Sequence, residues 1–229
     1  MVVVGSSRGI GLEIANDLVR HNNVFAYSRS SRPPEMSQDV KYFPLDVADQ
    51  DSINTNLVNS SPNLIDGIVY VAGFSTPSDG QEVARFVKTI DINLIGAFRV
   101  IEALQDKLAP NSSVVFVSSI NANLAFPNNP GYVASKAGLE GLVRALSLDL
   151  ASIPCRVNAI SLGYFVTDMT RSSFNDPEKK KQREARTVLG RWGELREITP
   201  AVEFLLSDKS SYMTGQALVI DGGWTVRGI

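Results

Sequence analysis

The stretch that decides the fold is VVVGSSRGIG, residues 2–11, in which a β-branched run passes directly into a glycine-rich loop. Ile10, Ile14 and Leu18 then recur at helical spacing, so the pattern predicts a strand, a tight loop and a helix. Glycines permit positive φ angles and a close backbone approach to a ligand, and the N-terminus of the helix offers free N–H groups to a pyrophosphate. We therefore expect a dinucleotide to be bound by Gly5, Ser7, Arg8, Gly9, Ile10 and Gly11.

Short apolar runs alternate with amphipathic segments along the rest of the chain. Nearly continuous apolar runs are typical of parallel strands covered on both faces, and strand–helix alternation favours right-handed crossovers. We expect one α/β domain over residues 1–229, built on a Rossmann-type, doubly wound parallel sheet of about seven strands with helices on both faces. The candidate strands are residues 2–4, 24–27, 40–43, 65–71, 114–117, 157–160 and 217–220.

Residues 163–196 interrupt this alternation just before the last candidate strand. A long segment at this place is typical of a lid over a substrate site, which is the role we expect for it. Within it lies a short run of mixed charges, Glu178 to Arg186. The simplest interpretation of that run is a helix face exposed to solvent.

The composition excludes several classes of function. Among the 229 residues, 22 basic and 24 acidic side chains give a formal charge of −2, so no field favours nucleic acid or an anionic membrane. Cys155 is the only cysteine and His21 the only histidine, so we expect neither a disulfide nor a metal site. The N-terminus does not resemble a signal peptide and no apolar run reaches membrane-spanning length, so we expect a soluble, cytoplasmic protein.

The segment after the second candidate strand bears on the choice of cofactor. Residues 28–32 read SRSSR, and no Asp or Glu occurs before Glu35. An NAD-binding protein usually has an acidic residue here for the ribose hydroxyls. Arg29, joined by Arg8, would instead pair with a 2′-phosphate, so the sequence favours NADP(H) over NAD(H). The alternative is that both arginines are ordinary surface residues.

Three residues in the second half of the chain could form a proton-transfer site. Tyr132 and Lys136 lie four residues apart on a predicted helix, so they share one face, and Ser119 follows a candidate strand. A phenol titrates near ~10, and a nearby ammonium favours the phenolate, which would suit an acid or base. Ser119 could donate a hydrogen bond to a substrate oxygen. By spacing alone the pair is weakly diagnostic.

Further motifs occur in order along the chain. They are Gly5-x-x-x-Gly9-x-Gly11, Leu45-Asp46-Val47, Ala72-Gly73, Asn93, Ser118-Ser119, Tyr132-x-x-x-Lys136, Gly163 to Thr167, Thr214-Gly215-Gln216 and Asp221-Gly222-Gly223. Over essentially its whole length the chain resembles the short-chain dehydrogenase/reductase family, in the single-domain branch that contains the 3-oxoacyl-carrier-protein reductases.

The resemblance implies a hydride transfer between a nicotinamide and a carbonyl or alcohol substrate. It implies that Tyr132 exchanges a proton with the substrate oxygen and that Ser119 orients this oxygen. Lys136 would bind the nicotinamide ribose and lower the pKa of Tyr132, and Asn93 would hold a water that links Lys136 to solvent. Further cofactor contacts implied in the same way are Asp46, Val47, Ala72, Gly73 and Thr167.

The substrate and the assembly stay open. A 3-oxoacyl thioester is the nearest family precedent, a sugar or other small polar metabolite is the alternative, and a non-catalytic dinucleotide sensor is the most remote. Where carrier-protein reductases tend to have basic residues this chain has Pro110 and Ile153, with Lys107 and Arg156 only nearby. An acyl carrier protein is therefore a weakly supported partner. By analogy with the family we expect a homotetramer or homodimer.

Overall fold

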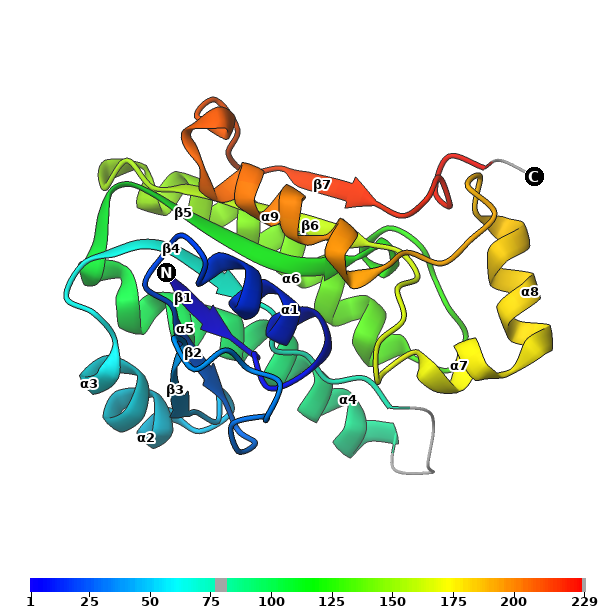
Figure 1. Cartoon of the computed structure of the whole chain (residues 1–229), viewed down its shortest axis with the longest axis horizontal. Coiled ribbons are helices and arrows are strands. Elements are labelled where there is room, and N and C mark those ends of the chain that lie inside the picture. Colours follow the sequence, from blue (N-terminus) through cyan, green and yellow to red (C-terminus); the bar gives the residue numbers. More distant parts are fainter. Residues whose placement is uncertain (77–81, 228–229) are drawn as a thin grey trace.

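The computed structural model describes residues 1–76 and 82–227. Its described part contains one seven-stranded sheet in the order β3-β2-β1-β4-β5-β6-β7, and every neighbouring pair of strands is parallel. The predicted α/β fold, with about seven parallel strands and helices on both faces, is confirmed (Figure 1). The strands are β1 (Val2–Val4), β2 (Phe25–Ser28), β3 (Lys41–Pro44), β4 (Ile65–Tyr70), β5 (Leu108–Ser119), β6 (Arg156–Leu162) and β7 (Ala217–Ile220).

Helices of several lengths connect the strands. The α-helices are α1 (Gly9–Leu18), α2 (Gln50–Ser52), α3 (Val58–Ser60), α4 (Glu82–Ile90), α5 (Gly96–Leu104), α6 (Pro130–Asp149), α7 (Arg171–Asn175), α8 (Pro177–Arg186) and α9 (Thr199–Leu206). Two π-helical segments are η1 (Ile53–Leu57) and η2 (Asp91–Ile95), and the 3₁₀ segments are η3 (Gln105–Lys107), η4 (Ile120–Ala122), η5 (Leu150–Ser152), η6 (Leu195–Glu197) and η7 (Asp208–Ser210).

Alternation of side chains along the strands divides the core into two layers. Val3 and Val115 point to the face covered by α1 and α9. Val4 and Phe116 point to the opposite face, which η1, α5 and α6 cover. Apolar residues are needed on both sides of each central strand, which is why these strands read as unbroken apolar runs.

The strand boundaries expected from the sequence are less accurate than the strand positions. Strand β5 starts at Leu108 rather than at residue 114, because the buried serines Ser112 and Ser113 interrupt the apolar pattern without ending the strand. The hydroxyl of Ser113 donates a hydrogen bond to the carbonyl of Leu205 in α9 at 2.7 Å. A hydroxyl that is satisfied in this way is tolerated in a core.

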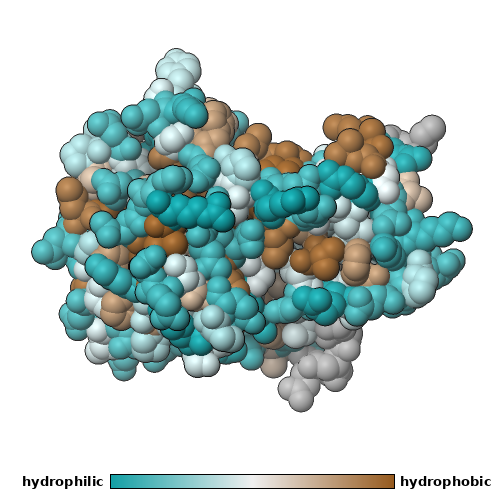
Figure 2. Space-filling model, viewed as in Figure 1, coloured by the Kyte–Doolittle hydropathy of each residue, from teal (hydrophilic) through white to brown (hydrophobic). Residues whose placement is uncertain are grey.

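The carboxyl ends of the strands point toward α7 and α8, which stand beyond that edge of the sheet (Figure 1). Residues 163–196, where the sequence predicted an interruption of the strand–helix alternation, contain α7, α8 and the start of η6. Hydrophilic residues predominate on the face shown in Figure 2, above all at the edge where α8 lies. Within the described residues, no helix is both long and apolar enough to cross a membrane.

Candidate active site

A cleft of about 430 Å³ lies at the carboxyl ends of the central strands. This is the place where doubly wound sheets bind their ligands. Ser119 lines it together with every residue predicted to contact a cofactor: Gly5, Ser7, Arg8, Gly9, Ile10, Gly11, Arg29, Asp46, Val47, Ala72, Gly73, Tyr132, Lys136 and Thr167. Asn93 is fully buried and lies behind this lining.

The glycine loop has no room for side chains at two positions. Gly5 has a φ of 91°, and a Cβ there would overlap the backbone of Ala72, while a Cβ at Gly11 would overlap the carbonyl of Gly5. The first turn of α1 contains no acidic residue, and no side chain caps its N–H groups. Uncapped N–H groups beside a closely approached backbone fit the pyrophosphate of a dinucleotide.

Two arginines lie in the cleft beside the glycine loop and the end of β2. Arg8 and Arg29 both line the cleft, and neither forms an ion pair with an acidic residue in the described part of the chain. The hydroxyl of Ser28 donates to that of Ser7 at 2.9 Å, which joins the end of β2 to the glycine loop. Among the described residues, neither guanidinium has a hydrogen-bond or ion-pair partner, so both are available to an anion in the cleft.

Asn93 lies in the π-helical turn η2, a distortion that often occurs at functional sites. Its Oδ1 accepts from the Phe74 amide at 2.7 Å, and its Nδ2 donates to the Phe74 carbonyl at 3.0 Å. Nδ2 also donates to the Ser135 hydroxyl at 2.9 Å, which in turn donates to the carbonyl of Tyr132 at 2.8 Å. Both donors of the amide therefore fix the loop after β4 and the helix that carries Tyr132.

Tyr132, Lys136 and Ser119 meet at the end of β5. The Lys136 ammonium lies 5.6 Å from the Tyr132 ring centre and donates to the Val117 carbonyl at 2.8 Å. Burial raises the pKa of Tyr132 above its usual value, while a hydrogen bond with Ser119 opposes this and nearby Tyr164 adds to it. The sequence predicted the opposite direction. Lys136 is not among the groups that shift the pKa of Tyr132, and burial lowers the pKa of Lys136 itself to about 8.

Sequence reasoning missed a buried carboxylate behind these groups. Glu140 lies one helical turn after Lys136 and is 7% exposed. Its Oε1 accepts from the Ser118 hydroxyl at 2.9 Å and its Oε2 from the Asn123 amide at 3.4 Å. Burial lowers the pKa of Lys136, and the negative charge of the same carboxylate raises it. The spacing of four residues from Lys136 could have indicated it.

Comparison with known proteins gives the same class as the site. A family model described as "Enoyl-(Acyl carrier protein) reductase" matches residues 4–225. Among curated relatives, the 3-oxoacyl-[acyl-carrier-protein] reductase FabG of Staphylococcus aureus is 32% identical, covering 97% of this chain and 96% of its own. The gluconate 5-dehydrogenase of Gluconobacter oxydans is 29% identical, covering 98% and 94%.

A solved structure of similar shape is the Pseudomonas aeruginosa RhlG/NADP active-site complex. It is 27% identical, with a TM-score of 0.88, and the match covers 97% of this chain and 94% of that one. The fold and these similarities define an oxidoreductase of the class that binds NAD(P). The chain belongs to the short-chain dehydrogenase/reductase family, as the resemblance of its motifs indicated.

The electrostatic effect of Glu140 on Lys136 predicts a pH effect that can be measured without a substrate. Lys136 is charged below its pKa, so its charge is lost as the pH rises through about 8. Glu140→Gln removes the carboxylate that raises this pKa, so the lysine should lose its charge at a lower pH. The measurement is an NMR titration of lysine ¹³Cε, with the signal assigned through Lys136→Met.

Glu102→Gln, an exposed carboxylate on α5, is the control and should leave the titration unchanged. An unaltered Lys136 midpoint in Glu140→Gln would show that this carboxylate does not act on the lysine.

Proposed function

We propose that this chain is an NADPH-dependent reductase of a small carbonyl compound. The main support is that a single cleft is lined by the uncapped glycine loop, by the unpaired Arg8 and Arg29, and by Tyr132 and Lys136. A guanidinium binds a 2′-phosphate through charge-assisted hydrogen bonds, whereas the adenosine ribose of NADH offers it no anion. When bound, the nicotinamide supplies a hydride to the carbonyl carbon.

The direction of the pKa shift at Tyr132 supports reduction. A phenol whose pKa lies above its usual value is protonated at neutral pH, so Tyr132 enters the reaction as an acid. Its hydroxyl donates a proton to the carbonyl oxygen as negative charge develops there. Alcohol oxidation needs a Tyr132 phenolate that accepts a proton from the alcohol. Burial disfavours this phenolate until the pH is high.

The other residues position this acid. Ser119 lies beside the Tyr132 hydroxyl and donates a second hydrogen bond to the carbonyl oxygen. Lys136 binds the ribose hydroxyls of the nicotinamide nucleotide, and Asn93 fixes Tyr132 through Ser135. Both Asn93 donors are engaged, and its Oδ1 accepts from the Phe74 amide, so a relay water binds through the second lone pair of Oδ1. Residues 163–196 act as the substrate lid of the single catalytic domain.

A free substrate fits the surface better than one carried by a protein. Lys107, near the first expected docking position, donates to the Val58 carbonyl at 2.6 Å and to Ser61 at 2.8 Å. Arg156, near the second, donates to Ser210 at 2.8 Å and to the Ser207 carbonyl at 3.1 Å. Both cations serve internal contacts. The relatives named as 3-oxoacyl-carrier-protein reductases favour a second candidate, a 3-oxoacyl thioester.

The cofactor assignment predicts a selective effect of Arg29→Ala. Loss of about 1–2 kcal/mol of phosphate binding should weaken NADPH about five- to thirty-fold. Binding of NADH should change little, because its ribose carries no phosphate. The measurement is a fluorescence titration with each cofactor. Arg20→Ala, which removes an exposed arginine at the end of α1, is the control. Equal losses for both cofactors, or a preference of the wild type for NADH, would contradict the assignment.

A homodimer or homotetramer is proposed from apolar side chains on the outer faces of α4, η2 and α5. Phe86, Val87, Ile95 and Phe98 are 39–59% exposed there. Phe98→Glu should shift the oligomer toward monomer, because a carboxylate is costly to bury in an apolar contact. Size-exclusion chromatography with light scattering at micromolar concentration measures this. A monomeric wild type would contradict the proposal.

A further inference from the structure

An aromatic cluster extends from the catalytic tyrosine toward the lid. Its centre is Tyr164, which follows β6 and lies near enough to Tyr132 to raise the pKa of its phenol. Ring centres of Trp224 and Trp192 lie 4.9 and 5.2 Å from that of Tyr164. Phe126 completes this side at 6.1 Å. These residues come from four separate segments, so the fold assembles an aromatic cluster next to Tyr132.

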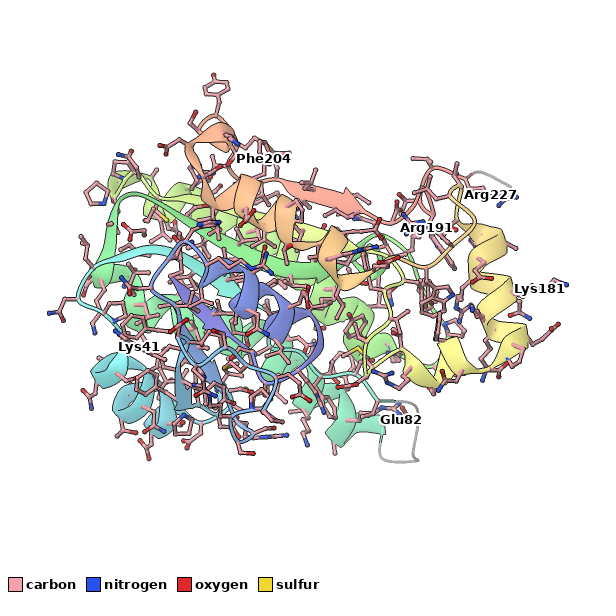
Figure 3. All side chains as sticks on the ribbon, in the orientation of Figure 1. Lys41, Glu82, Lys181, Arg191, Phe204 and Arg227 are labelled. Carbon is pink, nitrogen blue, oxygen red and sulfur yellow. The ribbon has the colours of Figure 1, made fainter. Side chains whose placement is uncertain are left out.

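Helix α8 packs its cations on this cluster. The guanidinium of Arg183 lies 4.9 Å from the Tyr164 ring centre, and that of Arg186 lies 5.4 Å from the Trp224 ring centre. The three-residue spacing places both on one face of the helix. The interpretation of the charged run as a solvated face is therefore wrong for this side and holds for the outer one, where Lys181 points away from the sheet (Figure 3).

Two donors within this arrangement are buried and unsatisfied. Arg183 Nε and Trp192 Nε1 find no hydrogen-bond acceptor among the described residues, and Trp192 is only 5% exposed. Two acidic groups of the same helix region pair elsewhere, Asp176 with Lys179 and Glu184 with Lys180. Buried donors are nearly always satisfied, so two of them around one ring indicate a missing acceptor.

We propose that Arg183 and Trp192 bind a carboxylate of the substrate, so that the carbonyl compound reduced is a small keto acid. This rests on the proposed function, since it places the carboxylate on the substrate of that same site. A carboxylate has two acceptor oxygens for the two unsatisfied donors, and its charge complements the unpaired guanidinium. The aromatic rings exclude water around this contact and strengthen it.

The chain itself provides a reporter for binding that does not depend on catalysis. It has two tryptophans, and both belong to the cluster. Intrinsic fluorescence therefore reports on this site alone. The full-length protein is titrated with 4-oxopentanoate and with its neutral isostere 4-oxopentanamide, both cofactor-free and saturated with NADP⁺. Arg183→Met and Arg183→Lys are compared with the control Arg186→Met, which removes a stacked but exposed guanidinium from the same helix face.

We expect the wild type to bind the acid about ten-fold or more tightly than the amide, as a charge-assisted hydrogen bond provides. Arg183→Met should abolish this preference, Arg183→Lys should keep part of it, and Arg186→Met should retain it. Equal affinity for acid and amide, no response to either, or an unchanged preference in Arg183→Met would overturn the carboxylate assignment.

Activity is measured separately, as NADPH oxidation with neutral ketones and with keto acids. Reduction of neutral ketones without acid-selective fluorescence would leave the proposed function standing and remove the carboxylate assignment. Acid-selective binding without NADPH-dependent reduction of any carbonyl would support the carboxylate site and contradict the proposed function.

Discussion

The carboxamide of Asn93 is the contact on which the geometry of the site depends. It is fully buried, and its three hydrogen bonds join the loop after β4 to the helix that carries Tyr132. An aspartate in its place would bury a charge and lose both donors, and an alanine would leave the Phe74 backbone groups unsatisfied. Asn93 lies in the π-helical turn η2, and its hydrogen bond to Ser135 links that turn to the helix of Tyr132.

Burial then decides the chemistry of the groups so placed. It keeps Tyr132 protonated and lowers the pKa of Lys136 to about 8, and Glu140 opposes the second effect. The pKa of Lys136 is thus set by desolvation, which lowers it, and by the Glu140 carboxylate, which raises it. A neutral phenol beside Ser119 suits the donation of a proton to a carbonyl oxygen. Arg8 and Arg29 add two unpaired cations to the lining of the same cleft.

Much of this could be predicted from the sequence, because its signals are local. The glycine loop could be interpreted as a dinucleotide-binding loop because it lies between a strand and a helix. Tyr132 and Lys136 could be placed on one helix face from their spacing alone. What could not be predicted depends on contacts between distant segments. The direction of the pKa shift of Tyr132 follows from burial, and the contact of Arg183 with Tyr164 follows from how residues 163–196 fold back on the sheet. A run of mixed charges has the same pattern whether its inner face meets water or aromatic rings.

In the proposed NADPH-dependent reduction, Tyr132 acts as the neutral proton donor. The most direct test measures Tyr132→Phe against the carbonyl compound that the wild type reduces fastest. NADPH binding, followed by fluorescence, should remain within a few-fold of the wild type, while kcat for reduction should fall by about 10²-fold or more, the usual contribution of a general acid. A variant that binds NADPH and still reduces the carbonyl at a wild-type rate would contradict the account.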